Sequence, residues 1–419
     1  MAAKTNFDID IDIVIAGGGM IGSCLALALA PLGLRVAMVE AVARGEPGQP
    51  SFDERSTALS RSSQRMFAAM GLWPDIVAAA TPISGIHVSD RGGFGFSHID
   101  AAEQNVEALG YVVINRVLGE VLQKSLPAVP SLEFICPARI TGVDASPDHV
   151  VVGVDEPGGQ RQLRCSLLVA ADGANSTVRD MLGIRASRTD YGQCAVIGNV
   201  LPEKPLANRA YERFTESGPL ALLPVTDGRA AFVFNVSRED AASLMQLPDD
   251  AFTEKLQAAF GHRLGRFGKV GRRDSYPLAL TRARRLTATR SVLVGNAANG
   301  LHPVAAQGFN LGMRDIASLC DCVADVLCAH GNRDAIDRIG DDRVLSAYAE
   351  WRRADHRKVV QLTDGLVRLF GSERLPVRAL RDLGMLGFDL VPGVRNLFAR
   401  HAMGLAGKLP RLSRGVPLA

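Results

Sequence analysis

The chain has 419 residues, 47% of them apolar and 22% charged, which excludes a disordered or fibrous protein and predicts a soluble globular one with more than one domain. Its formal net charge of +3 comes from the end of the chain, where five Lys or Arg side chains and no acidic ones follow Asp389. The rest is close to neutral, so we expect no nucleic-acid binding. The cysteines include no Cys-x-x-Cys pair and the first residues do not form a secretory leader, which together predict a cytoplasmic protein with reduced thiols.

The beginning of the chain has the pattern of a strand–helix–strand unit. Ile11–Ala16 is an apolar run of strand length, Met20–Ala30 is a helix of small residues, and Val36–Glu40 is a second strand. Ile13–Leu34 carries no charge over 22 residues, but its consecutive glycines and Pro31 fit a strand, turn and helix better than a membrane span. The pattern therefore predicts a nucleotide-binding unit.

A glycine motif occupies the turn between the first strand and the helix. It reads Gly17-Gly18-Gly19-Met20-Ile21-Gly22, which fits G-x-G-x-x-G. Gly17 allows a tight turn, Gly19 allows close approach of a pyrophosphate, and Gly22 allows the helix to pack against the strand. Glu40 ends the second strand, where an acidic side chain can accept a hydrogen bond from a ribose hydroxyl. The motif predicts a dinucleotide site but does not by itself distinguish FAD from NAD.

Further strands and helices follow, and the character of the chain changes near residue 186. The elements expected before that point are a helix over Ser62–Met70, a strand over Tyr111–Ile114 that leads into a helix, a meander of Leu132–Ile135, Ile140–Val143 and Val150–Val154, and a strand over Leu163–Ala170. Between residues 186 and 285, Gly, Pro and Asp turns separate the expected strands of an antiparallel sheet, Cys194–Val200, Tyr211–Thr215, Ala221–Pro224 and Ala230–Val236. From Ile316 onward the pattern is mostly helical.

These patterns predict an α/β protein in which a Rossmann-like domain is interrupted by an antiparallel-sheet domain. The expected boundaries are 1–80, 105–185 and 286–340 for the three parts of the nucleotide-binding domain, 81–104 and 186–285 for the sheet domain, and 341–419 for a C-terminal helical region with a basic tail.

Two later segments also combine a strand, a loop and the start of a helix. The first, Ala170–Arg179, contains Asp172-Gly173 directly after a long apolar strand. In the second, a strand ends at Gly295, a polar turn contains His302-Pro303, and Gly308 opens a helix. Backbone N–H groups at a helix start are unpaired and attract electron-rich groups. Together with the N-terminal motif, these segments suggest one large cofactor bound at both of its ends.

The three motifs, in this order and at these separations, resemble those of the class A flavoprotein aromatic hydroxylases, the para-hydroxybenzoate hydroxylase-like group. The resemblance covers essentially the whole chain. The segments that are similar to the ubiquinone-biosynthesis branch of this group are Phe52–Ser60, Gly218–Pro224, Gly295-Asn296-Ala297-Ala298, Gln307–Asp315, Met403-Gly404 and Leu409–Leu412.

The resemblance implies a para-hydroxybenzoate hydroxylase-like FAD-binding domain with an inserted substrate domain. It also implies that NAD(P)H reduces the FAD, that O2 adds at the C4a atom of the flavin, and that one oxygen atom is delivered to the ring of a prenylated phenol. Because the flavin carries this chemistry, neither a catalytic side chain nor a metal site is assigned. The protein would orient the flavin, stabilise negative charge at its N1/O2 edge and exclude water.

The resemblance further implies which residues surround the FAD. Pro303, Gln307 and Gly308 are expected beside the isoalloxazine ring. The amides of Phe309 and Asn310 are expected to donate to its N1/O2 edge. The other expected contacts are Gly17, Gly19, Met20, Ile21, Gly22, Glu40, Arg55, Arg116, Asp172, Gly173 and Asn296. An equally good interpretation of Arg116 is a solvated arginine at the start of a helix. The residue that accepts the phenol proton is left unassigned, because His302 could accept it or could instead stabilise the turn.

Two residues depart from the usual motif. Asn296 stands where aspartate is usual; it keeps hydrogen-bonding capacity, and the ubiquinone branch tolerates it. Ala306 stands where glycine is usual before Gln307, and we expect its methyl group to fill space. The alternatives to the hydroxylase are a sister hydroxylase acting at another ring position, a non-catalytic scaffold subunit of a ubiquinone-biosynthesis complex, and a flavin reductase of prenyl double bonds.

The end of the chain has the pattern of a basic amphipathic helix. The apolar positions at helical spacing are Val394, Leu397, Phe398, Ala402 and Leu405. The basic positions around them are Arg395, Arg400 and Lys408. Such a helix can lie on an anionic membrane surface, which suits a substrate with a long isoprenoid chain and predicts a peripheral location on the inner face of the cytoplasmic membrane. It can also be a helix docked on the core with a solvated basic face.

Overall fold

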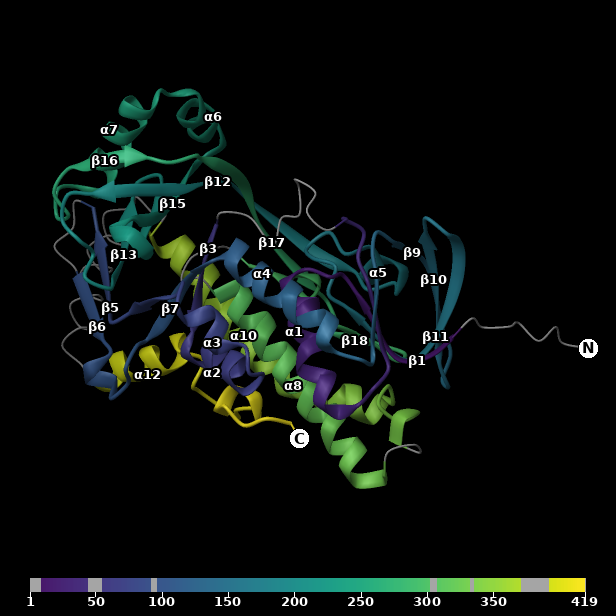
Figure 1. Cartoon of the computed structure of the whole chain (residues 1–419). Helices are drawn as coiled ribbons and strands as arrows, with labels where there is room; N and C mark the ends of the chain where they lie inside the picture. The colour runs from purple at the N-terminus through teal and green to yellow at the C-terminus, as the bar shows by residue number, and fades with distance from the viewer. Residues whose placement is uncertain are drawn as a thin grey trace, which may run out of the picture.

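The computed structural model describes residues 9–43, 55–91, 96–301, 307–331, 335–370 and 392–418. Two large sheets, joined by long strands and covered by helices, make up most of it, and the predicted α/β fold is confirmed. Figure 1 shows the first sheet on the right, around β1 and β11, and the second on the left, around β5 and β13.

Within the described residues, the first sheet has eight strands and a parallel centre. Its order is β18-β19-β11-β1-β2-β8, with β10 and β9 added antiparallel through β11. The strands are β1 (Ile9–Ala16), β2 (Val36–Val39), β8 (Leu132–Ile135), β9 (Arg139–Ala145), β10 (Val150–Glu156), β11 (Gly159–Ala170), β18 (Thr287–Ala288) and β19 (Ser291–Leu293). The parallel strands have the order of a doubly wound nucleotide-binding sheet.

The predicted meander is wrong in its first strand. β9 and β10 do pair antiparallel, but β8 lies at the far edge of the sheet, parallel to β2. The helix before it, α4 (Asn115–Ser125), packs in the same core as α1 (Met20–Leu29), so β8 is delivered beside β2 by a crossover helix. A short apolar run does not show which partner its strand will take.

The first two motifs meet at the centre of this sheet. β1 lies between β2 and β11, at the point where the strand order reverses, and connections that diverge there leave a crevice at the carboxyl ends of the strands. Gly17 N donates to Val39 O at 2.8 Å, and Ala171 N donates to Ala16 O at 2.8 Å. The loops after β1 and β11 therefore begin side by side.

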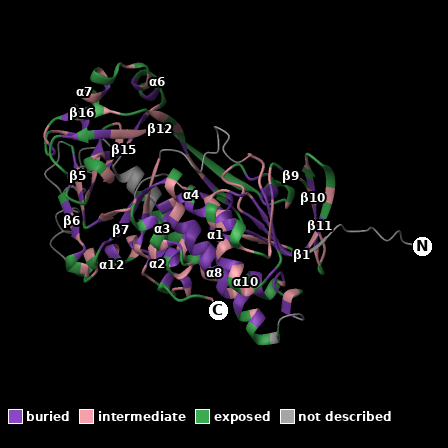
Figure 2. Cartoon of the chain, in the orientation of Figure 1, coloured by how far each residue is buried: buried purple, intermediate pink, exposed green. Residues whose placement is uncertain are grey.

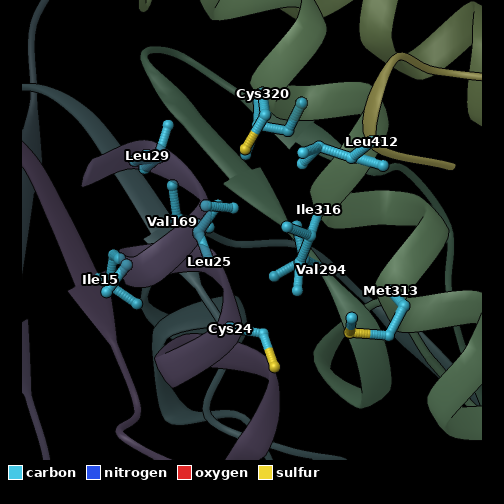
Figure 3. Close-up of a cluster of buried hydrophobic side chains, with 14 of the residues drawn as sticks. Ile15, Cys24, Leu25, Leu29, Val169, Val294, Met313, Ile316, Cys320 and Leu412 are labelled. Atoms are coloured by element: carbon cyan, nitrogen blue, oxygen red, sulfur yellow. The ribbon is translucent and has the colours of Figure 1, made fainter. Parts of the chain in front are cut away.

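Helices α1 and α8 (Gln307–His330) pack together on one face of the first sheet. In Figure 3, Leu25 and Leu29 of α1 lie with Ile316 and Cys320 of α8 in one buried apolar cluster. Burying a leucine or isoleucine side chain contributes about 1.5–3 kcal/mol to folding. A Cβ added at Gly312 would lie 2.7 Å from Ile21 Cδ1, so this glycine lets α8 cross close to α1.

The second sheet has the order β20-β17-β12-β15-β14-β13-β5-β6, with β16 beside β12. Its strands are β5 (Gly85–Asp90), β6 (Phe96–Asp100), β12 (Ala186–Pro202), β13 (Arg209–Thr215), β14 (Gly218–Pro224), β15 (Ala230–Ser237), β16 (Phe267–Val270), β17 (Asp274–Ala283) and β20 (Asn299–Gly300). All these pairings are antiparallel, as the sequence predicts, except β13 with β5. Helices α6 (Arg238–Gln246) and α7 (Asp249–Phe260), which the sequence did not predict, pack on one face of this sheet.

The remaining elements connect and cover the two sheets. A small antiparallel sheet contains β3 (Ser56–Ser60), β4 (Thr81–Ile83) and β7 (Gly110–Ile114), and the other helices are α2 (Arg61–Ala69), α3 (Trp73–Val77), α5 (Thr177–Met181), α10 (Asp342–Phe370) and α12 (Pro392–Ala402). In Figure 2 the buried residues are concentrated along α1, α8 and the strands of the first sheet. No helix of the described ranges is long and apolar enough to cross a membrane.

Candidate active site

A cavity of about 1840 Å³ lies between the carboxyl edge of the first sheet and one face of the second. The loops after β1, β2 and β11 line one side, and strands β5, β13, β14 and β15 line the other. The starts of α1 and α8, together with α10 and α12, complete the walls. All three sequence motifs therefore open into the same space.

The glycine motif wraps closely around the start of α1. Gly17 has φ +101°, and a Cβ there would lie 2.7 Å from Ala171 O. A Cβ at Gly22 would lie only 1.9 Å from Gly17 O, so Gly22 is required by the packing of the helix on its own loop. No side chain caps the start of α1 at Gly19, and Gly19, Met20 and Ile21 line the cavity. This helix start is suited to bind an anionic group such as a pyrophosphate.

Glu40 holds the same loop from the end of β2. Its Oε2 accepts from Gly18 N at 2.6 Å, and its Oε1 accepts from Val42 N at 2.8 Å. Glu40 also lines the cavity. The carboxylate is thus fixed beside the glycine motif. Its contact with a ribose hydroxyl stays a prediction.

Asp172 has one oxygen paired and one unpaired. Oδ2 accepts from Val178 N at 3.1 Å, at the start of α5. Oδ1 is buried and accepts no hydrogen bond from any described residue. Buried polar atoms are rarely left without a partner, and Asp172 and Gly173 both line the cavity. The unpaired oxygen fits a site built for a ligand with a hydroxyl or N–H donor.

The start of α8 faces the cavity opposite the glycine motif. Gln307, Gly308 and Phe309 line it, so the N-terminal end of a 24-residue helix, where the positive end of the helix dipole lies, is at this wall. The side chain of Asn310 is instead buried in the protein, where its Oδ1 accepts from Ser60 N at 2.8 Å. The role predicted for its backbone amide stays a prediction. His302, Pro303 and Ala306 lie outside the described residues.

A buried network of charges, not predicted from the sequence, supports the third motif. Asp315 accepts hydrogen bonds from Gly295 N at 3.1 Å, from Arg352 Nε at 2.7 Å and from His356 Nε2 at 2.6 Å. Asn299 donates to Nδ1 of His356 at 2.6 Å, which leaves the hydrogen on Nε2. The network ties the loop that carries Asn296 to α8 and α10.

The pKa values in this network follow from the balance between burial and charge. Burial alone would raise the pKa of Asp315, but His356 and Arg352 outweigh it and lower the pKa. Burial likewise opposes ionisation of Asp355, and Arg314 and Arg352 still lower its pKa to about 2. Both carboxylates are therefore charged at neutral pH and hold α10 against α8.

The two predicted arginines lie in different environments. Arg55 lines the cavity with its Cζ 4.7 Å from the centre of the Tyr276 ring. Arg116 is not among the lining residues; its guanidinium forms an ion pair with Glu120 at 2.7 Å on an exposed face of α4. This placement favours the interpretation of Arg116 as an arginine at a helix start.

The predicted residues that line the cavity are Gly17, Gly19, Met20, Ile21, Glu40, Arg55, Asp172, Gly173, Asn296, Gln307, Gly308 and Phe309. Asn296 is exposed in this space. Gly22 acts behind the lining, through the packing described above.

The face of the second sheet that lines the cavity is mostly apolar. Ile86, Val88, Ala221, Leu223 and Val233 contribute aliphatic side chains to it. Glu212 of β13 also lines it, and burial raises the pKa of this carboxyl to about 7. Ala221 and Leu223 lie in the segment Gly218–Pro224 that the resemblance marks, but none of these residues was predicted as a site residue.

Helix α12 forms part of the cavity wall. Val394, Leu397, Phe398, His401 and Ala402 line it. Several of these were expected on the apolar face of a basic amphipathic helix, and that face lies on the cavity. Two of the basic side chains around it contact the protein: Arg395 pairs with Glu103 at 3.1 Å, and Lys408 Nζ lies 4.2 Å from the centre of the Trp351 ring.

A family model described as an FAD binding domain matches residues 10–354. The chain belongs to this FAD-binding family. It is 36% identical to ubiquinone hydroxylase UbiL of Rhodospirillum rubrum over 97% of this chain and 93% of the relative. It is 29% identical to 3-demethoxyubiquinol 3-hydroxylase of Escherichia coli, over 94% of this chain and 98% of that one. The predicted relationship to FAD-dependent aromatic hydroxylases is confirmed, and the chain is an FAD-dependent monooxygenase.

Solved structures show the same fold. The p-nitrophenol 4-monooxygenase PnpA from Pseudomonas putida DLL-E4 superimposes with a TM-score of 0.76 at 19% identity, covering 95% of this chain and 99% of PnpA. The predicted para-hydroxybenzoate hydroxylase-like fold is therefore confirmed. FAD, the cofactor of the family, fits the cavity because the glycine loop, the unpaired Asp172 Oδ1 and two helix starts supply donors and acceptors along its length.

Proposed function

We propose that this enzyme hydroxylates the aromatic ring of a prenylated phenol in ubiquinone biosynthesis, with NAD(P)H and O2 as co-substrates, and that it is a 2-octaprenyl-6-methoxyphenol hydroxylase. The observation that supports the proposal is that one cavity is lined both by the three sequence motifs and by an apolar sheet face. An apolar face suits a ring with a long isoprenoid chain better than a small charged substrate. The names of UbiL and of the Escherichia coli relative support the pathway.

The residues of the first side would hold the FAD. The start of α1 and the glycine motif would bind the pyrophosphate, and Glu40 would bind a ribose hydroxyl. Asp172 and Asn296 would bind hydroxyl groups along the chain of the cofactor. When bound, the flavin supplies the redox chemistry and the transfer of oxygen. The start of α8, at Gly308 and Phe309, would stabilise negative charge at the N1/O2 edge of its ring.

Helix α12 supports an extension of this proposal to the membrane surface. Leu397 is 59% exposed and Val394 is 50% exposed, although both also line the cavity. An apolar rim at a cavity mouth offers a path for an isoprenoid chain and a contact with lipid. We therefore place the enzyme in the cytoplasm, peripheral on the inner face of the membrane, and in reach of a ubiquinone-biosynthesis complex.

The test is the chemical identity of the intermediate that accumulates when the gene is deleted. Mass analysis of the quinone precursors should show a prenylated phenol that lacks one ring hydroxyl, and the missing position distinguishes this enzyme from a sister hydroxylase. The purified protein should also be yellow. Accumulation of no prenylated phenol, or a colourless protein that takes up no FAD, would favour a scaffold role over the proposed reaction.

A further inference from the structure

Strand β13 places one carboxylate between apolar side chains of the second sheet. Glu212 lies directly opposite Val88 of β5 and Ala221 of β14. Ala221 lies opposite Val233 of β15, which lies opposite Ile197 of β12. All five side chains line the cavity. The row continues to Ser97 of β6, opposite Val88, and to Asp274 of β17, opposite Ile197. Because register fixes which side chains share a face, Glu212 is the one charged group among the five side chains named above.

The surroundings of Glu212 do not explain it as a structural residue. Its neighbours two positions along β13, Ala210 and Phe214, also line the cavity and are apolar. Within the described part of the chain, its carboxylate has no hydrogen-bond or ion-pair partner. Glu212 is half-buried at the cavity wall, and its partial removal from water, which disfavours a carboxylate without a partner, raises the pKa of this group to about 7. The small side chains of Ala210 and Ala221 leave space next to it.

We infer that Glu212 is the proton acceptor for the hydroxyl group of the phenol substrate. This inference rests on the proposed function. As the ring gives electron density to the incoming oxygen atom, the phenol O–H bond breaks and an O–H bond forms on the Glu212 carboxylate. The electron pair of the broken O–H bond moves from the phenol oxygen into the ring as the new C–O bond forms, and Glu212 is neither oxidised nor reduced. When the ring becomes aromatic again, the hydrogen of the hydroxylated carbon passes as a proton, through water, to the phenol oxygen. The proton passes to water when the product leaves, which restores the carboxylate.

The geometry also defines the pH dependence of this step. The strands packed against Glu212 present only Val88 and Ala221 at this point. The charged or titratable groups on the other walls of the cavity are Glu40, Arg55, Arg139, Asp172, Tyr276, Asp355, Lys358 and His401. Glu212 accepts a proton only when it is ionised, so kcat/KM should rise as the pH increases through about 7.

The kinetic test compares Glu212→Gln with Glu216→Gln in flavin-loaded protein. Glu216 is an exposed glutamate in the turn of the same hairpin and serves as the matched control. Glu212→Gln should lower hydroxylation by about 100-fold and abolish its rise near pH 7, because glutamine cannot take the proton. NAD(P)H should still be oxidised, with hydrogen peroxide released in place of product. Wild-type rate and pH profile in Glu212→Gln would overturn the inference and leave the proposed function intact.

A binding test does not depend on turnover. A short-chain prenylated phenol and its methyl ether are titrated at pH 8 into the oxidised, flavin-loaded protein, and binding is followed by flavin fluorescence. The wild type should prefer the phenol by about tenfold, because only the phenol donates a hydrogen bond to the carboxylate. Glu212→Ala should lose this preference. An unchanged preference would contradict the inference even if the wild type hydroxylates no prenylated phenol, so the two failures are distinguishable.

A third measurement reports the ionisation of Glu212 itself. Its pKa is raised in the folded state, so between about pH 4 and pH 7 the folded protein holds a proton that the unfolded chain has lost. The wild type should therefore lose stability relative to Glu212→Gln as the pH rises through this range. A difference in Tm that does not change with pH would show that the pKa of Glu212 is not raised in the folded protein.

Discussion

The two sides of the cavity are built by different means. On the flavin side, backbone groups are arranged by local sequence: glycines let a loop and a helix start approach within contact distance of Ala171 O. On the substrate side, side chains are arranged by strand register, so Glu212 faces the cavity because β13 pairs with β5 and β14 in one particular alignment. In the proposed assignment, cofactor binding therefore depends on contiguous residues, whereas substrate recognition depends on residues brought together over long distances in sequence.

The largest effect that separates the two sides should come from Gly22→Val. A Cβ at this position would lie 1.9 Å from the carbonyl oxygen of Gly17. Because the clash is with a backbone atom, only a movement of the glycine loop could relieve it. We expect the purified variant to contain no detectable flavin by absorption. Gly142→Val in strand β9 is the control, because a Cβ there meets nothing within 4 Å. Full flavin occupancy in Gly22→Val would place the dinucleotide site elsewhere.

Asp315→Asn should have the next largest effect and should act through the support of the flavin side. The change leaves the buried guanidinium of Arg352 with one carboxylate partner fewer. Breaking a buried ion pair costs about 3–5 kcal/mol, and we expect the low end of this range because Asp355 still pairs with Arg352. Thermal unfolding of the flavin-loaded protein measures the loss. The control is Asp325→Asn, which breaks the surface pair with Arg411 and should lower the free energy of unfolding by about 1 kcal/mol or less. Equal losses in the two variants would mean that the buried pair contributes no more stability than the surface pair.

Ala221→Phe tests the substrate side alone. A phenyl ring at this position would extend from the sheet into the cavity next to Glu212. We expect KM for a prenylated phenol to rise about tenfold or more, with flavin content and Tm close to those of the wild type. Ala221→Ser changes the volume little and is the control. If Ala221→Phe lost flavin while keeping its affinity for the phenol, the assignment of the two sides would be reversed.

The smallest effect should come from Leu397→Asp on the rim of the cavity. Leu397 is 59% exposed, and removing its contact with lipid should weaken binding to anionic vesicles about fivefold, from roughly 1 kcal/mol of lost apolar contact. Flavin content should not change. Leu201→Asp, at a leucine that is 44% exposed on β12, controls for a new charge elsewhere. Equal vesicle binding by both variants would remove the support for a membrane-facing α12.

The sequence predicts the two sides of the cavity to different extents. The flavin-side motifs consist of neighbouring residues whose spacing reflects a turn and a helix start, and the structure brings all three to one cavity. The parallel position of β8 was missed because a short apolar strand carries no information about its partner. The helices α6 and α7 were missed because the surrounding alternation favoured strands throughout residues 186–285.

The buried charges were missed for a related reason. Asp315 lies within a quoted motif, but its partners Arg352 and His356 come from α10, and nothing local pairs them with it. Glu212 lies in a strand whose alternation was visible from the sequence. Its apolar neighbour Val88, however, belongs to a strand more than a hundred residues earlier in the chain, and Val233 lies one strand beyond Ala221. The apolar surroundings of the carboxylate therefore become visible only from the order of the strands in the sheet.

The central claim is that the flavin side and the apolar sheet face act together on one substrate. The most direct measurement is mass analysis of the product formed by the flavin-loaded enzyme from a prenylated phenol, NAD(P)H and heavy-isotope O2. We expect the product to carry one additional oxygen atom, and that atom to be labelled. Incorporation of unlabelled oxygen from water, or reduction of the prenyl chain without any gain of oxygen, would contradict the account.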